Sequence, residues 1–596
     1  MNFSDTIFAE LASRGIRQVF AVPGGGNMFL INAACSNPVM EVTFCHNEQA
    51  AAIAAEAFYK VARVPAVCLV TTGPGSTNAI TGIVGAWLDS SSMIVLAGQV
   101  KIADKKPVGL RQKGPQEIDF IAMIDGSCLD YVEFGGPSRR DLIRVLDSLG
   151  SSPRKGPVVL SVPLDIQNSK REPIEDPNQP SSFASSPTSF DFSSLLTELN
   201  NSSRPAILVG EGCRDISSTL LGTFFDLCAD HKIACLFSWL SYDLLAWDEP
   251  ANMGRPGNVA KRFPNFVVQT SDVLVIIGSR LDNTQTAFDA HRFGLRSNPY
   301  LIDIDQHELD KMPTRFNKIL ANSSTFVEQF VEYFKRVDLP IHRNPWWDYC
   351  RHLKTRFGTE IPSQTQNSPS SGLSIDEVVD FLSNWIPAGT TIVTGSSGLS
   401  IEIFHVGFRN KTGQRIFLTT ALGSMGFGLP AVVGVAQIDR VEEVVLFESD
   451  GSFMMNIQEL VTFKSIKKRV LVFLINNGGY ASIRSSQKRH FGKIMGTDGT
   501  SGLVFPNFNK VINAFGFDCY TCVTLEELDN ALRLTADTHS PLFFELIVEP
   551  NSELLPKCGV TFKETGIVSN SLENMDPLLT DTDLRDLLSI AGREKS

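Results

Sequence analysis

The sequence predicts an α/β protein with three doubly wound parallel-sheet domains, and three observations support this fold class. Continuous Val, Ile and Leu runs end in Gly or Ser and alternate with helical patterns, which is typical of parallel strands buried on both faces. The chain has 596 residues, whereas an ordinary domain has roughly 100–200. Two stretches rich in Ser, Pro, Asn and Gln divide the chain into segments of comparable size.

The three segments share one arrangement, in which a buried strand leads into a turn and then a helix. Ligands of such sheets bind at the carboxyl ends of the strands, which is where these turns lie. The main strands lie within 64–73 and 91–99, within 204–212 and 271–280, and within 391–397, 441–451 and 470–479. The predicted division is a domain at 1–167, a linker at 168–192, a domain at 193–335, a linker region at 336–373, a domain at 374–550 and a tail at 551–596.

Composition excludes several classes of protein. Apolar residues make up 43% of the chain and charged residues 20%, so the chain is not globally disordered. The formal net charge is 53 − 65 = −12, which disfavours nucleic acid and favours small-molecule partners. No apolar run reaches the roughly 18 residues that span a bilayer, and residues 1–15 predict an amphipathic helix rather than a signal peptide. The 11 cysteines are scattered and odd in number, which fits a reducing cytoplasm better than a disulfide framework.

An acidic and an amide residue mark the ends of two consecutive strands in the third segment. Asp450, in ESDGS at 448–452, follows one strand, and Asn477 follows the next strand 27 residues later. Oxygen atoms at neighbouring strand ends can share one cation, and Mg²⁺ prefers such ligands and often bridges to phosphates. Gly451 would let a diphosphate approach the backbone at a helix N-terminus. Taken alone, the ESDGS run is also compatible with a simple turn.

This pair resembles the diphosphate-binding signature of thiamine-diphosphate enzymes, in which Gly-Asp-Gly is followed at this spacing by Asn-Asn. The chain departs at the first position, where Ser449 replaces Gly, but it keeps the carboxylate. The resemblance implies that Asp450 and Asn477 bind Mg²⁺ through their side chains and Gly479 through its carbonyl. It also implies a pyrimidine-binding, a central Rossmann-like and a diphosphate-binding domain.

The resemblance reaches to about residue 560 and is closest to the acetolactate-synthase-like branch, of the large catalytic subunit type. Each motif is weak by itself, but six in the same order are specific. They are PGGGNMFL at 23–30, HNEQAAAIAAEAFYK at 46–60, TTGPGSTNAITGI at 71–83, GPVVLSVPLDIQ at 156–167, GSRLDN at 278–283 and ALGSMGFGLPAVVGVA at 421–436.

The resemblance gives Glu48 a catalytic role. In this family a glutamate hydrogen-bonds N1′ of the aminopyrimidine and favours the tautomer that takes the C2 proton of the thiazolium. The apolar surroundings of Glu48 suit such proton transfer, although without the resemblance a solvated helix carboxylate is the simpler interpretation. Because Glu48 and Asp450 lie in different segments, the cofactor is expected between two domains. In this family these usually come from different subunits, which implies a homodimer or homotetramer.

The resemblance assigns further residues to the cofactor and the substrate. Met425 is expected as an apolar wedge beneath the cofactor, Ile483 against the thiazolium and Gly423 at the aminopyrimidine. Met and Ile in such runs are otherwise ordinary core residues. Gln116 is expected to face the substrate. The other cofactor-binding positions are Pro23, Gly24, Gly73, Asn78, Gly451 and Ser452.

The middle segment matches the part of acetolactate synthases that holds FAD. Related enzymes bind ADP there or nothing, so all three possibilities stay open for this chain. The matching positions are Arg154, Gly210, Gly212, Gly278, Arg280 and Asp303.

Four positions near the expected substrate depart from acetolactate synthases. Thr284 replaces an Arg that grips the carboxylate of the second keto acid, and Ser486 replaces a Trp that favours 2-ketobutyrate. Leu164 replaces a Lys, and Pro115 stands where a Phe is usual. Losing a charge-assisted pair typically costs about 1.5–3 kcal/mol, so a second 2-keto acid is a poorer acceptor here than a bulkier one.

The resulting hypothesis is a thiamine-diphosphate- and Mg²⁺-dependent carboligase. The favoured substrate is the 2-keto acid pyruvate, which the enzyme would decarboxylate. It would then transfer the acetyl unit to an acceptor carbonyl, such as that of a nucleotide-linked keto sugar. A genuine acetolactate synthase, and a decarboxylase or lyase that releases an aldehyde, are the alternatives. A non-catalytic homologue is disfavoured because Glu48, Asp450 and Asn477 occur together. The tail either closes over the active site or packs on the surface.

Overall fold

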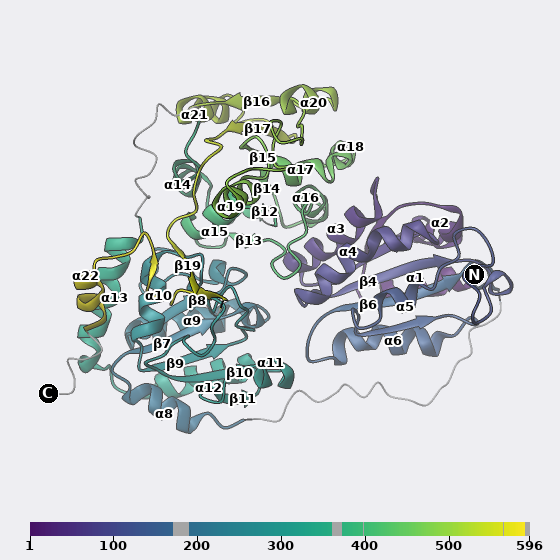
Figure 1. The fold of residues 1–596 in the computed structure, drawn as a ribbon. Coiled ribbons are helices and arrows are strands. Elements are labelled where there is room, and N and C mark those ends of the chain that lie inside the picture. The colour runs from purple at the N-terminus through teal and green to yellow at the C-terminus, as the bar shows by residue number, and fades with distance from the viewer. Residues whose placement is uncertain (171–189, 360–371, 397, 564–565, 590–596) are drawn as a thin grey trace. The chain divides into compact units, whose positions relative to one another are not determined.

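Three parallel sheets form the framework of the computed structural model and confirm the predicted fold class (Figure 1). The structure describes residues 1–170, 190–359, 372–396, 398–563 and 566–589. Most of the expected linker at 168–192 and of the Ser- and Pro-rich stretch at 360–373 therefore lies outside the described residues. One compact unit holds the first and third sheets, and another holds the second sheet and the C-terminal tail.

The first domain is a six-stranded sheet in the order β2-β1-β3-β4-β6-β5. Strands β3 and β4 are buried along their whole length, as the unbroken apolar runs predict, and so is β6. The predicted N-terminal helix is confirmed, and Asn2 caps it. The strands are β1 Gln18–Ala21, β2 Glu41–Phe44, β3 Ala66–Val70, β4 Met93–Gln99, β5 Asp130–Glu133 and β6 Pro157–Pro163. The helices are α1 Phe3–Ser13, α2 Met28–Ser36, α3 Glu48–Ala62, α4 Pro74–Leu88, α5 Phe120–Ile124, α6 Arg139–Ser151 and α7 Leu164–Gln167.

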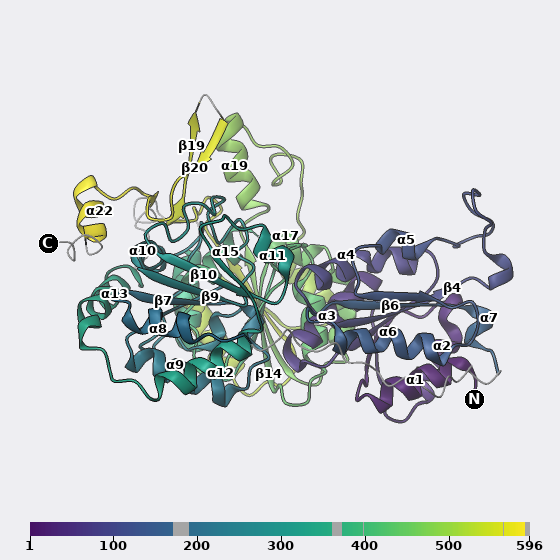
Figure 2. The same cartoon turned by 90° about the horizontal axis from the view of Figure 1, so that it is seen from below.

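The central domain is a five-stranded sheet in the order β11-β10-β9-β7-β8. Helices lie on both faces of this sheet, which makes it doubly wound (Figure 2). Its strands are β7 Pro205–Val209, β8 Ala234–Phe237, β9 Val273–Ile277, β10 Asn298–Asp303 and β11 Asn317–Leu320. Its helices are α8 Ser193–Asn201, α9 Ser218–Asp230, α10 Arg262–Thr270, α11 Gln306–Asp310 and α12 Ser323–Phe334.

Part of the predicted linker region at 336–373 is a helix instead. Helix α13 (Asn344–Phe357) buries Trp346, Cys350, Leu353 and Phe357 in the core of the central domain. These four residues recur at helical spacing, and a Pro stands in the first turn, which are two signals of a helix. The linker prediction was therefore wrong for this helix. The Ser- and Pro-rich residues at 360–373 that follow it do have the composition of a linker.

The third domain is a six-stranded sheet in the order β13-β12-β14-β15-β17-β16. Its strands are β12 Thr391–Thr394, β13 Arg415–Phe417, β14 Glu443–Ser449, β15 Arg469–Asn476, β16 Cys519–Cys522 and β17 Leu542–Ile547. The helices along this part of the chain are α14 Ile375–Trp385, α15 Leu399–Gly407, α16 Gly428–Val435, α17 Asp450–Met454, α18 Leu460–Phe463, α19 Ala481–Phe491, α20 Phe508–Ala514 and α21 Leu525–Leu534. Short 3-10 turns occur at 25–27, 102–104, 211–213, 242–244, 341–343 and 457–459.

The C-terminal tail packs on the central domain. Asn265 of α10 donates to the carbonyl of Leu572 at 3.0 Å, and Arg262 donates to the carbonyl of Met575 at 3.0 Å. This contact supports surface packing for the described part of the tail. The tail contains β18 Lys557–Cys558, β19 Val560–Lys563, β20 Gly566–Ser569, β21 Met575–Asp576 and α22 Asp581–Leu588, with β18 paired to β21 and β19 to β20.

The first and third domains share a core in which α3 packs closely on α16. A Cβ atom added at Gly434 would lie 2.1 Å from the carbonyl oxygen of Ala54, so the two helix backbones meet where only glycine fits. We expect Gly434→Ala to lower the free energy of unfolding by about 1–3 kcal/mol, because either backbone must shift. Urea unfolding measures this. Gly222→Ala, at an exposed helix position with open space around it, is the control and should be neutral or stabilising; equal effects of the two variants would contradict the assignment.

Cys519 and Cys522 have the spacing of a CxxC motif, but they do not form a disulfide or part of a zinc site. Both lie on strand β16, where residues three positions apart point to opposite faces. Both thiols are free, and burial raises the pKa of Cys522 to about 11.

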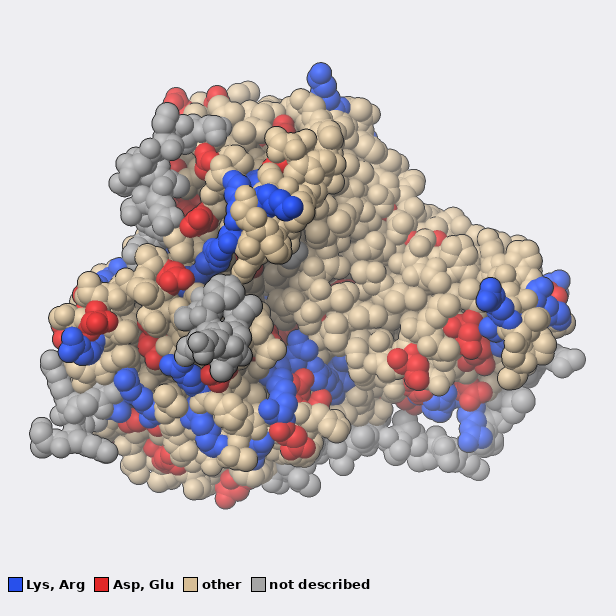
Figure 3. Space-filling view, viewed as in Figure 1, with Lys and Arg blue, Asp and Glu red and all other residues tan. Residues whose placement is uncertain are grey.

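The distribution of charged side chains and the composition of the helices bear on the partners expected of the chain. Where charged side chains gather on the face drawn in Figure 3, Lys and Arg are intermixed with Asp and Glu. Among the helices of the described residues, none combines the length and apolar character needed to cross a membrane.

Candidate active site

Asp450 is buried at the point where β14 ends and α17 begins. Its side chain accepts hydrogen bonds from the backbone amides of Gly451 at 2.7 Å and Gly479 at 2.9 Å. Burial raises the pKa of Asp450 to about 6, although these backbone amides oppose the shift. A carboxylate whose charged form is penalised by burial is stabilised by a cation beside it.

Asn477 supplies the second oxygen that the sequence predicts. Its side chain is 4% exposed, and its Oδ1 atom is buried without a hydrogen-bond partner among the described residues. A buried polar atom without a partner is costly, and a metal ion is the kind of ligand that would satisfy it. Within the described ranges, no group of three or more His, Cys, Asp or Glu side chains is placed to hold a metal ion. The residues present therefore fit a Mg²⁺ that takes its remaining ligands from phosphates and water.

Gly479 is required at its position by the backbone. Its φ is +131°, and a Cβ there would lie 2.1 Å from the carbonyl oxygen of Thr497. Its amide holds Asp450, and its carbonyl, the predicted metal ligand, accepts from the amide of Ala481 at 3.0 Å. A carbonyl oxygen has two lone pairs, so this contact leaves one for a cation.

Ser449 shows why the first glycine of the motif is dispensable here. Its φ is −89° and its ψ is 149°, an extended conformation that any residue adopts. Its hydroxyl lies 2.7 Å from the hydroxyl of Ser400 on α15, and both are buried. The substitution is thus accommodated by a local hydrogen bond and leaves Asp450 in place.

The glycine-rich segment at 423–426 lies against the start of α17. Ser452 accepts a hydrogen bond from the amide of Gly426 at 2.9 Å. A Cβ at Gly451 would be 3.4 Å from the terminal methyl of Met425, so these two predicted residues are neighbours. Gly423 has a φ of +63°. Ile483, on α19, is 49% exposed, as expected of an apolar side chain that does not belong to the core.

Glu48 is the first residue of α3, and its carboxylate is held inside the first domain. Asn78 donates to its Oε2 at 2.9 Å, and a Cβ at Gly75 would lie 3.2 Å from Oε1. The side chain is 9% exposed. The structure therefore brings together two residues that the sequence assigned separately, and Asn78 positions the carboxylate.

Gly73 and Gln116 also meet in this domain. A Cβ at Gly73 would lie 2.6 Å from the carbonyl oxygen of Gln116, so glycine permits this approach. Gln116 is exposed, with a φ of +64°. The adjacent Glu117 accepts from the amides of Lys106 and Lys113, each at 3.0 Å, which fixes the loop that presents Gln116.

The loop of Pro23 and Gly24 is fixed from two sides. Asn27 accepts from the amide of Gly24 at 2.9 Å and donates to the carbonyl of Val22 at 3.0 Å. The amide of Gly26 donates to Thr71 at 3.1 Å, two residues before Gly73. Pro23, Gly24 and Gly73 thus lie just beyond the carboxyl ends of β1 and β3.

The residues predicted to bind thiamine diphosphate or the metal ion form two clusters, which belong to two different sheets. Glu48 and Asn78 belong to the first sheet, whereas Asp450 and Asn477 belong to the third. In the part of the chain that the structure describes, no hydrogen bond or ion pair joins Glu48 to Asp450 or Asn477. Among the described residues, each cluster is therefore held by its own hydrogen bonds.

The residues matched to FAD do not form one described cluster. Gly210, Gly212 and Gly278 contact one another, and the amide of Gly212 donates to the carbonyl of Gly278 at 3.0 Å. These close backbone contacts require glycine at the three positions, whether or not a nucleotide binds. Asp303 is buried at the end of β10 and accepts from the amide of Asp305 at 2.9 Å. Arg154 belongs to the first domain, where it donates to Ser90 at 2.9 Å.

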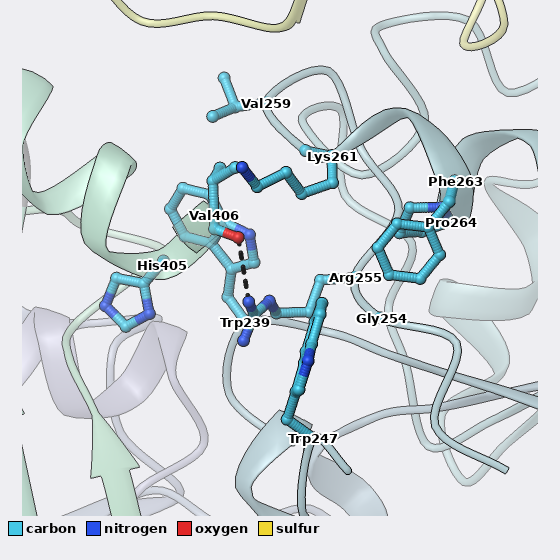
Figure 4. Close-up of a pocket in the computed structure, with 11 residues that line it drawn as sticks. Trp239, Trp247, Gly254, Arg255, Val259, Lys261, Phe263, Pro264, His405 and Val406 are labelled. Carbon is cyan, nitrogen blue, oxygen red and sulfur yellow. Dashed lines mark hydrogen bonds between the residues drawn. The ribbon is translucent and has the colours of Figure 1, made fainter. Parts of the chain in front are cut away.

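Sequence reasoning missed a pocket lined by aromatic and cationic residues in the second compact unit. Arg255 is buried and lies 4.2 Å over the ring of Tyr242. Figure 4 shows its guanidinium pointing to the carbonyl of Val406, to which it donates at 3.1 Å. The side chain of Arg255 thus occupies part of the pocket. Its lining includes Trp239, Trp247, Arg255, Lys261, Phe263 and His405.

His405 of this pocket predicts a pH-dependent loss of stability. Burial and the nearby Arg255 lower its pKa to about 3, against an opposing effect of Asp243, and Tyr242 lies 3.4 Å from Nδ1. The unfolded state, with an ordinary pKa of about 6.5, binds more protons between pH 3 and 6.5. Stability is therefore lost as the pH falls below about 6.5, by about 2 kcal/mol at pH 5.

Urea unfolding of the wild type and of His405→Gln at pH 8 and pH 5 tests this. The difference in unfolding free energy between the two pH values should be smaller in the variant by about 2 kcal/mol. His490→Gln, at an exposed position, is the matched control. An unchanged pH dependence in His405→Gln would contradict the buried neutral state.

Comparison with known proteins identifies the family. Residues 1–123 match the family described as "Thiamine pyrophosphate enzyme, N-terminal TPP binding domain". Residues 192–330 match the "Thiamine pyrophosphate enzyme, central domain". Residues 395–546 match the "Thiamine pyrophosphate enzyme, C-terminal TPP binding domain".

The chain belongs to the thiamine pyrophosphate enzymes. Among them it is acetolactate-synthase-like. It is 27% identical to acetolactate synthase 2, chloroplastic, of Nicotiana tabacum over 94% of this chain and 84% of that protein. It is 27% identical to acetolactate synthase, chloroplastic, of Arabidopsis thaliana, with the same coverage, and 25% identical to acetolactate synthase 1, chloroplastic, of Zea mays over 94% of this chain and 88% of that protein.

Both clusters lie in domains that match the cofactor-binding domains of the thiamine pyrophosphate enzymes. The cluster around Glu48 lies in the N-terminal cofactor-binding domain, and the cluster around Asp450 lies in the C-terminal one. Of the four positions that depart from acetolactate synthases, Pro115, Thr284 and Ser486 are exposed and Leu164 is half-buried. The side chain of Thr284 donates to Asp282 beside it.

Proposed function

We propose that the chain is a thiamine-diphosphate- and Mg²⁺-dependent carboligase that decarboxylates a 2-keto acid, pyruvate in the first instance. It then transfers the acetyl unit to an acceptor carbonyl. The observation that carries this proposal is the pair of clusters. One holds a carboxylate, Glu48, by Asn78. The other holds the buried Asp450 and Asn477, whose Oδ1 atom has no hydrogen-bond partner among the described residues.

Each cluster has a chemical task in this proposal. Asp450 and Asn477 would hold Mg²⁺ and, through it, the diphosphate. Thiamine diphosphate, when bound, supplies the nucleophilic carbon and the electron sink for decarboxylation. Glu48 would hold a proton at N1′ of the aminopyrimidine, with Asn78 keeping its carboxylate oriented. Gln116, presented beside Gly73, would contact the substrate.

The departures from acetolactate synthases support an acceptor other than a second 2-keto acid. Thr284 offers no positive charge to a carboxylate, and the exposed Ser486 leaves more room than Trp would. A bulkier acceptor, such as a nucleotide-linked keto sugar, fits these changes. Synthesis of acetolactate from two pyruvates and release of an aldehyde are the rival outcomes.

Mass spectrometry of the products separates these outcomes. The enzyme, loaded with thiamine diphosphate and Mg²⁺, is incubated with pyruvate alone and with a panel of keto-acid and nucleotide-sugar acceptors. We expect an acetyl adduct with a nucleotide-linked keto sugar and little acetolactate. Acetolactate as the main product, or free acetaldehyde whatever the acceptor, would replace this acceptor assignment by the corresponding rival.

We propose further that Glu48 and Asp450 of one site come from two subunits of a homodimer or of a homotetramer built from such dimers. Glu48→Gln and Asp450→Asn variants, each inactive alone, can be mixed after mild dissociation. If sites form between subunits, random pairing restores about a quarter of them. No recovery of activity in confirmed mixed dimers would place both residues in one chain.

FAD in the central domain is a separate proposal. It is supported by the match of Gly210, Gly212 and Gly278 to that part of acetolactate synthases, although packing alone explains these glycines. A flavin spectrum of the purified protein, with bands in the visible region, is the expected result. A colourless protein that does not take up added FAD would exclude it.

The free thiols of the described cysteines support a reducing compartment such as the cytoplasm.

A further inference from the structure

Lys60 and Asp89 form a buried ion pair in the first domain, outside the cluster around Glu48. Lys60 lies at the end of α3, and Asp89 directly follows α4. Nζ of Lys60 is 2.8 Å from Oδ2 of Asp89, with side chains 4% and 0% exposed. Glu56, one turn before Lys60, lies 3.3 Å from the same Nζ. Charges this deeply buried persist only when they are paired and hydrogen-bonded.

Further hydrogen bonds of this pair go to the third domain. Nζ of Lys60 donates to the carbonyl of Leu418 at 3.1 Å. Asp89 accepts from the amides of Thr420 and Ala421 and from the hydroxyl of Thr420, each at 3.1 Å. Residues 418–421 form neither helix nor strand, so these bonds replace those that regular structure would provide.

The segment fixed in this way leads directly to the predicted cofactor wedge. Gly423 follows Ala421 by two residues, and Met425 by four. Met425 in turn approaches Gly451 at the start of α17. A shift of residues 418–421 would therefore move Met425 relative to Asp450.

We propose that Lys60 and Asp89 are positioning residues that hold residues 418–421, and through them Gly423 and Met425, in the geometry that receives thiamine diphosphate. This inference rests on the proposed function, because it concerns the same cofactor site. It differs from a general role in joining the two domains. Arg440 also joins them, by donating to the carbonyl of Val61 at the end of α3, but among the described residues no hydrogen bond or ion pair links it to residues 418–421.

The test compares Asp89→Asn with Arg440→Met. Asp89→Asn keeps the size of the side chain but replaces an oxygen that accepts from Lys60 and Thr420 by a nitrogen that cannot accept. Calorimetric titration with thiamine diphosphate at saturating Mg²⁺ gives Kd, and thermal unfolding of the cofactor-free protein gives Tm. Titrations are run well below both Tm values. We expect Kd to rise roughly tenfold or more in Asp89→Asn and to change less than about twofold in Arg440→Met, although both variants lower Tm.

An unchanged Kd in Asp89→Asn, or an equal rise in Arg440→Met, would overturn the positioning role. If Asp89→Asn does not fold, the Kd of Thr420→Val is measured instead. This variant keeps the shape and removes one hydrogen bond to Asp89, so Kd should rise severalfold; an unchanged Kd would again overturn the proposal. A wild type that does not bind thiamine diphosphate would instead refute the proposed function itself.

Discussion

Replacing Glu48 by Gln is expected to slow exchange of the C2 proton of bound thiamine diphosphate by about 10²–10⁴-fold. The amide keeps the shape and the hydrogen bond from Asn78, but it cannot hold the proton at N1′. Quenched-flow deuterium exchange followed by NMR measures the rate, and calorimetry shows whether the cofactor is still bound.

The matched control is Glu41→Gln, which removes an exposed carboxylate of β2 in the same domain. This variant should exchange the C2 proton at the rate of the wild type. If Glu48→Gln also did so with the cofactor bound, the carboxylate would have no role in activation. Glu48 would then contribute only to the packing of α3.

Asp450→Asn is expected to weaken binding of thiamine diphosphate at a fixed Mg²⁺ concentration by at least about 100-fold. Residues that only orient metal ligands already contribute 10–100-fold to affinity, and Asp450 is the carboxylate among the residues proposed to hold this metal. The free energy of unfolding of the metal-free protein should change little, because the amide loses one of the two hydrogen bonds from Gly451 and Gly479 but also removes a buried charge. Burial raises the pKa of Asp450 to about 6, so its ionised form is destabilising in the empty site at neutral pH.

A large loss of affinity with little change in stability is the signature of a ligand site rather than of a structural carboxylate. Calorimetric titration and urea unfolding of the metal-free protein measure the two. Asp439→Asn, at an exposed position of the same domain, should change neither. A variant that loses stability but retains affinity would show that Asp450 serves the fold and not the cofactor.

The sequence was sufficient to predict the parts of the site that depend on strand ends. Asp450 and Asn477 follow adjacent strands β14 and β15, and parallel strands present their carboxyl ends at one edge. Burial of β3 and β4 followed from their unbroken apolar runs, because strands covered on both faces need apolar side chains on both. These features are local and therefore leave a clear pattern in the sequence.

Other features depend on contacts between residues far apart in the chain. Nothing near Asp89 in the sequence indicates that it accepts hydrogen bonds from Thr420, and Arg255 gives no sign that it will cap the end of α15. The hydroxyl pair of Ser449 and Ser400 likewise depends on how α15 meets β14. Helix α13 is a different case, because its pattern was present but adjoined a stretch of linker-like composition.

Release of CO₂ from pyruvate tests the central claim most directly. Purified protein, freed of metal and cofactor, is supplied with pyruvate labelled at C1, with thiamine diphosphate and Mg²⁺ added separately and together. The account predicts release of labelled CO₂ only when both are present, and its loss in Glu48→Gln and Asp450→Asn. No release from the wild type, with the cofactor shown by calorimetry to be bound, would contradict a pyruvate-decarboxylating carboligase.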